Sequence, residues 1–307
     1  MTGVLGLLKP PGPTSLDMVA MVRSVTGQRR VGHAGTLDPE AAGVLPICVG
    51  TATRLADYLH IPSKTYVFQL VLGLCTDTDD LTGKVLAETN AGTLSASDLT
   101  GVLPRFTGWI EQSVPRFSAR KHHGDRLFRY ARRQEVVPLP VARVCVESWE
   151  LIAWRCAGRR SLALCRVRCM SGTYIRSLCR DIGLALGVGA VMGPLVRVMA
   201  GGITASTCLT PRELEEAVSA GALSHVLLSP SEALRFLPAV VLDPAEVAHL
   251  QHGICPGPRR AARDDMAGAV RLLGTDHSLL GIAERSVDGA VATLQLRKVL
   301  MVPQKTG

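Results

Sequence analysis

The stretch GHAGTLDP at residues 32–39 decides how the first part of this chain folds. Its two glycines allow tight turns and leave room for another molecule to approach the backbone closely. Pro39 disfavours a helical conformation for the preceding Asp38 and so favours an extended loop there. A carboxylate in such a loop is usually structural, because Asx turns and caps are common. Two interpretations stay open on these residues: a structural turn, or a catalytic carboxylate with the ring of His33 close by.

The segments around this loop predict a mixture of strands and helices. Residues 3–8 form an apolar run that ends at a sharp KPPG turn, as a short strand does. Thr14 or Ser15 can then cap a helix that extends through Val25 with apolar residues at helical spacing. We expect two further strands at 65–74 and 162–169, and an amphipathic helix at 173–186.

The last third of the chain predicts short helices followed by a small β-rich domain. Three tetrapeptides combine an N-cap residue, proline and a glutamate at the third helical position, and so predict helix starts at 210–213, 229–232 and 243–246. Short β segments typical of a small barrel are expected at 239–242, 270–273, 279–283, 291–296 and 298–302. We place a domain boundary near residue 235.

The composition excludes several classes of protein. The chain has 307 residues, of which 47% are hydrophobic and 20% charged, as in an ordinary globular protein. We find no run of roughly 18 apolar residues and no convincing secretory signal, so we expect a cytoplasmic protein without a membrane span. Nine cysteines, an odd number without a CxxC pair, favour reduced thiols over disulfides or zinc. An EF-hand-like spacing after Asp77 fails at Leu81, so no metal is indicated.

Positive charge is concentrated in the middle of the chain. The formal net charge is +8, and residues 105–180 contain 16 Lys and Arg against 5 Asp and Glu. Residues 155–180 contain seven Arg and no acidic residue. Such a stripe is typical of a protein that binds a polyanion such as nucleic acid. A solvated face in an Arg-rich chain explains the charge equally well, and charge alone does not decide between them.

Six motifs follow one another in an order and spacing that resemble the bacterial TruB family, the tRNA pseudouridine-55 synthases. They are KPPG at 9–12, GHAGTLDP at 32–39, GVLPICVGTATR at 43–54, KTY at 64–66, TDTD at 76–79 and GTYIR at 172–176. The resemblance extends over most of residues 3–200. The tail resembles the small PUA-like domain of the same family more loosely.

The resemblance implies an α+β fold, in which helices surround a mixed, largely antiparallel central sheet. It implies a pseudouridine synthase catalytic domain over residues 1–235, whose part at about 105–180 is basic and contacts RNA. Residues 236–307 are then a PUA-like β-barrel domain that binds RNA.

The resemblance also implies an activity: isomerisation of the uridine at position 55, in the T-loop of tRNA, to pseudouridine. Asp38 is then the nucleophile, Arg176 pairs with it, and Tyr66 stacks on a flipped-out base. The carboxylate can attack the ribose C1′ or the base C6, or stabilise cationic character at the sugar, and these routes stay open. No cofactor is expected, because the base is both the leaving group and the returning nucleophile. The implied partner is the tRNA T-arm, and we expect a monomer.

Further residues are implied to bind the substrate. They are His33, Tyr66, Tyr174, Leu195, Lys9, Lys121 and Arg197. Four positions depart from the usual family pattern: Glu40, Phe117, Arg120 and Val196. A second hypothesis is an RNA-binding or tRNA-folding module that keeps this fold but is catalytically silent.

Overall fold

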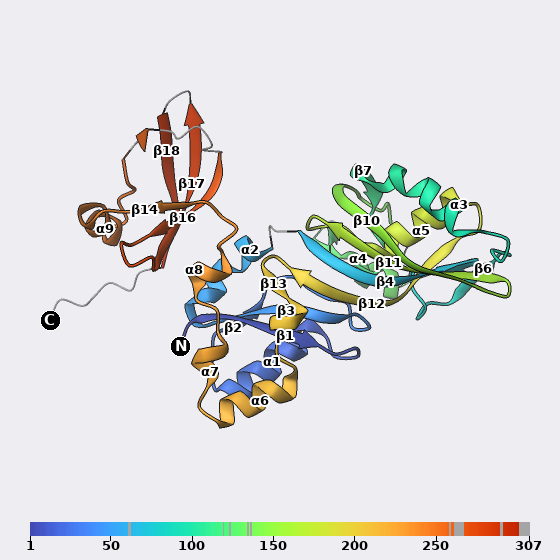
Figure 1. Cartoon of the computed structure of the whole chain (residues 1–307), viewed down its shortest axis with the longest axis horizontal. Helices are drawn as coiled ribbons and strands as arrows, with labels where there is room; N and C mark the ends of the chain where they lie inside the picture. The colour runs from blue at the N-terminus through green and yellow to red at the C-terminus, as the bar shows by residue number, and fades with distance from the viewer. Residues whose placement is uncertain are drawn as a thin grey trace.

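The computed structural model describes residues 1–60, 63–118, 120–122, 124–133, 135, 137–257, 259–260, 267–288 and 291–300. For residues 121, 122, 259 and 260 it describes the backbone only. The chain forms one large sheet with helices packed on it and a smaller C-terminal sheet (Figure 1).

The large sheet has nine strands, and its main path runs β1-β3-β12-β4-β11-β10-β7, with β2 paired to β3 and β13 to β12. Its strands are β1 (Gly3–Lys9), β2 (Val31–His33), β3 (Ala42–Val49), β4 (Lys64–Leu72), β7 (Gly108–Ser113), β10 (Val141–Ala157), β11 (Arg160–Cys169), β12 (Ala190–Ala200) and β13 (Ile203–Thr204). All pairings are antiparallel except that of β3 with β12. The predicted mixed, largely antiparallel sheet is confirmed.

Two groups of helices bury the apolar side chains of this sheet. Helix α5 (Ile175–Ala185) packs Ile175, Leu178 and Ile182 against alternate residues of β4, such as Phe68 and Leu70. Helices α1 (Ser15–Thr26), α6 (Pro211–Ser219) and α7 (Leu223–Val226) cover β1 and β3 in a second cluster. The short α3 (Ala96–Val102), with the 3₁₀ turn η2 (Leu103–Phe106), extends the cluster beneath α5.

Local capping explains where the late helices begin. Each of α6, α8 (Pro230–Ala233) and α9 (Pro244–Gln251) has proline at its first position and a complete capping box. The N-cap oxygen accepts from the third residue's N–H and the glutamate accepts from the N-cap N–H, so two otherwise unpaired donors are satisfied. The three predicted helix starts are confirmed, and Thr14 caps α1 in the same way.

The C-terminal sheet has five strands in the order β14-β16-β17-β18-β15, consistent with a PUA-like domain. Its strands are β14 (Ala239–Val241), β16 (Gly268–Leu273), β17 (Leu279–Asp288), β18 (Val291–Val299) and β15 (Arg259–Arg260). The predicted break between strands at 291–296 and 298–302 is wrong, because β18 continues through Arg297. Residues 301–302 of the second predicted strand lie outside the described residues. The pairing of β18 with β17 shifts register between Ile282 and Ala283, which pair with Lys298 and Leu296, so Arg297 is an extra residue in β18.

The remaining elements lie in the connections. They are η1 (Gly50–Leu55), α2 (Ala56–Leu59), β5 (Leu74–Thr76), β6 (Val85–Glu88), β8 (Lys121–His122), β9 (Asp125–Arg126), α4 (Leu127–Arg132) and η3 (Ala205–Thr207). Of the helices in the described ranges, none is long and apolar enough to cross a membrane.

Candidate active site

The loop that carries Asp38, between β2 and β3, is fixed on both sides of that residue. The Ser15 hydroxyl accepts from the Leu37 N–H at 2.9 Å and lies 3.1 Å from the Leu37 carbonyl, to which it donates. On the other side, the Lys9 Nζ donates to the carbonyl of Pro39 at 2.7 Å. A short polar side chain and a buried amine therefore hold the backbone that presents the carboxylate.

Asp38 is paired with Arg176, as the resemblance implies. The Arg176 Nη2 lies 2.9 Å from the Asp38 Oδ2; the arginine side chain is 6% exposed and the aspartate side chain 46%. The guanidinium also donates to the carbonyls of Thr78, at 3.2 Å, and Phe117, at 2.9 Å. Because these bonds fix the buried guanidinium, Arg176 orients a carboxylate that stays accessible from solvent.

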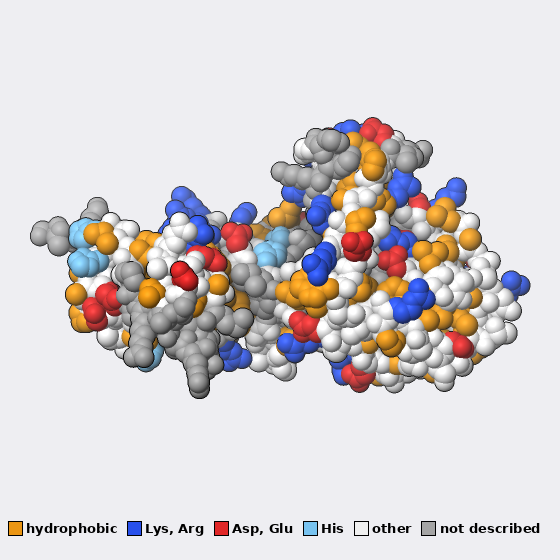
Figure 2. All heavy atoms as spheres, turned by 90° about the horizontal axis from the view of Figure 1, so that it is seen from above, with side chains coloured by type: hydrophobic (Ala, Val, Ile, Leu, Met, Phe, Trp, Pro, Cys, Tyr) orange, Lys and Arg blue, Asp and Glu red, His pale blue; other side chains and the backbone are white. Residues whose placement is uncertain are grey.

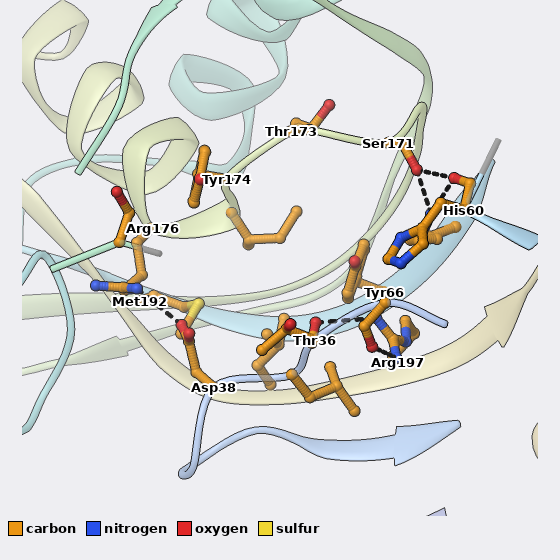
Figure 3. Close-up of a pocket in the computed structure, with 17 residues that line it drawn as sticks. Thr36, Asp38, His60, Tyr66, Ser171, Thr173, Tyr174, Arg176, Met192 and Arg197 are labelled. Carbon is orange, nitrogen blue, oxygen red and sulfur yellow. Dashed lines mark hydrogen bonds and ion pairs between the residues drawn. The ribbon is translucent and has the colours of Figure 1, made fainter. Parts of the chain in front are cut away.

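The pair lies at one end of a cavity of about 350 Å³. Figure 3 shows Asp38 and Arg176 pointing toward one another there, with His60 and Ser171 at the opposite end and Tyr66 between them. The cavity is lined by the Asp38 loop, β4, β12 and the segment that leads into α5. The described lining residues are Gly35, Thr36, Leu37, Asp38, His60, Lys64, Tyr66, Ser118, Ser171, Gly172, Thr173, Tyr174, Ile175, Arg176, Met192, Leu195 and Arg197.

Tyr66 and Arg197 face one another across paired strands. They are register partners in the β4–β12 pairing, and the Tyr66 side chain is buried. Burial raises the pKa of the Tyr66 phenol, which favours its neutral form. Arg197 itself is 1% exposed and donates to the carbonyls of Val44, at 2.7 Å, and Gly35, at 2.9 Å. Arg197 thus ties the loop before Asp38 to the sheet.

Gly43 allows this part of the sheet to close up. Its φ is +106°, and a Cβ there would lie 2.2 Å from the carbonyl oxygen of Arg197. Only glycine permits both the conformation and the approach of β3 to β12. This contact brings the Asp38 loop over Tyr66.

Tyr174 and Leu195 also line the cavity, and their predicted contacts with substrate stay predictions. Tyr174 is the N-cap residue of α5, and its backbone N–H donates to the Gln112 Oε1 at 2.8 Å. The Gln112 Nε2 donates to the Tyr174 carbonyl at 3.1 Å. Gln112 carries no signal in the sequence, because its role depends on β7 lying beside the start of α5.

Three residues at the opposite end of the cavity were also not identified. The Lys64 Nζ donates to the carbonyl of His60 and to the hydroxyl of Ser171, and that hydroxyl contacts the same carbonyl. Burial lowers the pKa of Lys64 to about 8. Lys64 belongs to the quoted KTY motif, which is the only signal in the sequence that pointed to it.

Three residues predicted to bind substrate lie elsewhere or are not described. Lys9 is 1% exposed, and its amine donates to the carbonyls of Pro10, Pro39 and Ala41. His33 lies on β2 outside the cavity lining, and burial lowers its pKa. The side chain of Lys121 lies outside the described residues. Their contacts with substrate stay predictions.

The basic stripe is largely paired with acidic residues. Five of the seven Arg in 155–180 have a carboxylate within 4.0 Å: Arg160, Arg166, Arg168, Arg176 and Arg180. Figure 2 shows basic, acidic and hydrophobic side chains intermixed over the face in view. Strand register places Glu150 opposite Arg166. Arg176 and Arg180 on α5 instead meet Asp38 and Asp79 from loops that are distant in the sequence, so the count of charges along the sequence overstated the free positive charge.

A second cavity of about 690 Å³ adjoins the first and shares Asp38, Arg176, Met192 and Leu195 with it. Glu40 and Phe117, two of the departures from the family pattern, line this second cavity. The other two, Arg120 and Val196, are exposed. Glu40 therefore lies outside the lining of the cavity that contains Tyr66.

The arrangement offers a carboxylate, a fixed cation, a buried aromatic ring and two cavities open to a large ligand. In the part of the chain that is described, no group of three His, Cys, Asp or Glu is placed to hold a metal ion. A carboxylate next to a cavity with a flat aromatic wall suits attack on, or charge stabilisation of, a ring-bearing substrate.

Comparison with protein families and characterised relatives gives one consistent result. Residues 23–175 match the TruB family pseudouridylate synthase N-terminal domain, and residues 176–235 match the tRNA pseudouridylate synthase B C-terminal domain. The tRNA pseudouridine synthase B of Symbiobacterium thermophilum is 43% identical over 257 residues, which cover 84% of each chain. That of Acaryochloris marina is 40% identical over 289 residues, covering 94% of this chain and 96% of the relative.

Solved structures of similar fold are consistent with these family matches. A crystal structure of a Cbf5-Nop10-Gar1 complex matches with a TM-score of 0.75 and 27% identity, covering 98% of this chain and 85% of the other. A structure of an H/ACA RNP bound to a substrate RNA containing 2′-deoxyuridine matches with a TM-score of 0.72 and 25% identity, covering 98% and 86%. From the motifs, the fold and these relatives together, the chain belongs to the TruB family of pseudouridylate synthases.

Proposed function

We propose that this chain is a tRNA pseudouridine synthase that isomerises the uridine at position 55, in the T-loop, to pseudouridine. The tRNA pseudouridine synthases B of Symbiobacterium thermophilum and Acaryochloris marina align with it over most of both chains. The single observation that carries the proposal is the Asp38–Arg176 pair at 2.9 Å, at the end of a cavity walled by Tyr66.

The reaction breaks the bond between uracil N1 and ribose C1′ and forms one between C5 and C1′. N1 gains a proton and C5 loses one, so the substrate and the product are isomers and no electrons are exchanged. Asp38 supplies the negative charge that attacks the nucleoside or stabilises its cationic form. Arg176 holds that carboxylate in place, and Tyr66 offers a flat face on which the detached base can turn.

The target base must leave its stack to reach this cavity, because the cavity is lined by buried residues of several elements. Extruding a base costs a few kcal/mol, and the cost is smaller in a loop than in a duplex. Loop bases are also the ones whose edges a protein can reach, since A-form grooves hide them. This supports a loop uridine as the substrate.

The alternative is a catalytically silent RNA-binding module. Such a module needs no half-exposed carboxylate held by a buried arginine, whereas Asp38 is held in this way. The pairing favours the enzyme.

The variant Asp38→Asn tests the proposal. It removes the charge but keeps the shape, so we expect loss of at least about a thousandfold in pseudouridine formation and tRNA binding within a few-fold of wild type. Pseudouridine is mapped by chemical modification in an unmodified tRNA transcript, and binding is measured by filter retention. A transcript with cytidine at position 55 serves as the substrate control.

Asp57→Asn is the matched protein control, because Asp57 lies on α2 outside the cavity lining. Near wild-type product from Asp38→Asn contradicts the nucleophile assignment. Product at another position in the transcript contradicts the T-loop assignment.

We further propose that residues 1–235 carry the chemistry, that residues 236–307 add RNA affinity, and that the enzyme works as a monomer in the cytoplasm. The cavity is lined entirely by residues before 200 of a single chain, which supports the first and third points. Light scattering of the free protein and of its tRNA complex tests the monomer directly.

A further inference from the structure

Ser118 stands out among the residues that line the active-site cavity. It is 4% exposed, and its Oγ is buried without a hydrogen-bond partner among the residues that the structure describes. Other hydroxyls that line the cavity are paired: the Thr173 Oγ1 donates to the Met170 carbonyl at 2.9 Å, and Ser171 contacts the carbonyl of His60. A buried polar group without a partner is destabilising, so natural proteins rarely keep one without a use.

The backbone around this hydroxyl is held in place. The Ser118 carbonyl accepts from the N–H of Phe128 at 3.1 Å, and the preceding Phe117 carbonyl accepts from the Arg176 Nη2 at 2.9 Å. The residue is therefore tied to the arginine that pairs with Asp38. Because Ser118 lines the cavity and one side-chain bond sets the direction of its hydroxyl, the backbone contacts leave the hydroxyl as the group that can adjust to a ligand.

We propose that Ser118 is a substrate-binding residue whose hydroxyl donates a hydrogen bond to a carbonyl of the uracil ring in the cavity. This inference rests on the proposed function. Uracil carries two carbonyl groups that lose their water when the base enters the cavity, and each then needs a donor.

The geometry of the reaction suits a hydroxyl donor. When the detached ring turns over about the axis through N3 and C6, N1 and C5 exchange places, and so do the C2 and C4 carbonyls. A donor that met one carbonyl before the turn meets the other afterwards. Ser118 can therefore bind the base in both orientations without moving its own backbone.

Ser118→Ala tests the proposal through the Tm of the free protein and the Kd for RNA. If Ser118 had only a structural role, the substitution would lower the Tm and weaken RNA binding together. Removal of an unpaired buried hydroxyl should leave the Tm of the free protein unchanged or raise it. The Kd for a T-arm stem-loop should nevertheless rise about three- to tenfold. Ser177→Ala is the contrast, because the Ser177 Oγ donates to the Ser113 carbonyl at 2.9 Å and its loss should lower the Tm.

A stem-loop with an abasic ribose at the target position completes a cycle. If the hydroxyl binds the base, the loss of affinity in Ser118→Ala should disappear with the abasic RNA. A loss that persists with abasic RNA, or a Kd that Ser118→Ala leaves unchanged for the uracil-containing loop, overturns the proposal. Ser219→Ala, on α6, controls for substitution as such.

Wild-type protein is first tested for pseudouridine formation in the same uracil-containing stem-loop. Failure at that step contradicts the proposed function, whereas success there followed by an unchanged Kd in Ser118→Ala contradicts this inference alone.

Discussion

Lys64 is a cation that the fold buries at the end of the active-site cavity, opposite Asp38. Its side chain is 7% exposed, and its amine donates to the carbonyl of His60. Burial penalises the charged amine and lowers its pKa from 10.5 to about 8. The folded protein therefore releases this proton at a lower pH than the unfolded chain does.

The pH dependence of stability should show this difference. Between pH 8 and 10.5 the unfolded chain keeps the proton that the folded chain has lost, so stability rises with pH in this window. We expect the free energy of unfolding of wild type, relative to Lys64→Met, to rise by about 3 kcal/mol across the whole window. Urea unfolding of both proteins from about pH 7 to pH 10 measures most of this rise.

Lys84→Met is the control for the loss of a lysine, because Lys84 is exposed. Its difference from wild type should show no comparable rise. If the difference between wild type and Lys64→Met stays constant from about pH 7 to pH 10, the lowered pKa of Lys64 is wrong.

At the scale of elements, α5 is joined to the turn that follows β5 by a second ion pair, one helical turn beyond Arg176. The Arg180 Nη1 lies 3.1 Å from the Asp79 Oδ2, and its Nη2 donates to the Ser113 carbonyl at 3.1 Å. Asp79 has φ +61°, a left-handed conformation that a non-glycine residue adopts only when its surroundings hold it. This pair fixes the turn whose Thr78 carbonyl accepts from Arg176.

Arg180→Met should therefore disturb catalysis without touching the substrate. We expect the single-turnover rate of pseudouridine formation to fall about tenfold, because Arg176 loses a fixed partner, while the Kd for tRNA changes less than about threefold. Asp79→Asn should act in the same direction. Rapid-quench kinetics at saturating enzyme measure the rate.

Arg212→Met is the matched control, since Arg212 pairs with Glu216 on the exposed face of α6. It should leave the rate unchanged. A single-turnover rate in Arg180→Met equal to that of this control contradicts the positioning role.

The sequence alone predicts those features of the fold and the site that depend on residues close together in the chain. The capping boxes at Thr210, Ser229 and Asp243 involve residues three apart, so their helices could be located without the fold. The pairing of Asp38 with Arg176 joins residues far apart in the chain, and only the motif resemblance pointed to it. The contacts of Gln112 with Tyr174 depend on tertiary structure and carried no signal.

The predicted basic stripe was misleading for a related reason, because the sequence does not show which arginines pair with acidic residues. The β10–β11 register places Glu150 opposite Arg166, and the two side chains form an ion pair. Strand register is not visible in a count of charges along the chain, so a paired sheet face was indistinguishable from a basic stripe.

At the scale of the whole molecule, the two sheets share one hydrophobic cluster. Ile282 of β17 is fully buried in the same cluster as Val4 of β1 and Leu55 of η1. Polar contacts join the same regions: the Arg54 Nη1 donates to the Val299 carbonyl at 2.8 Å, and the Lys298 Nζ donates to the Arg54 carbonyl at 2.6 Å. Figure 1 shows the C-terminal sheet beside α2 and α8, and the shared cluster joins it through these helices to the large sheet.

Because this cluster is shared, removal of residues 236–307 should expose apolar surface on β1 and η1. A point substitution inside the cluster therefore tests the coupling between the two sheets more cleanly than a truncation does. Ile282→Ala leaves a cavity between the sheets and should cost about 2–5 kcal/mol. If the sheets unfold together, calorimetry should show one transition whose Tm falls in this variant.

Val291→Ala, in the neighbouring strand but 48% exposed, should leave the Tm nearly unchanged. Two separate transitions, with only one of them shifted by Ile282→Ala, would show that the C-terminal sheet unfolds independently and that the shared cluster does not couple the two parts.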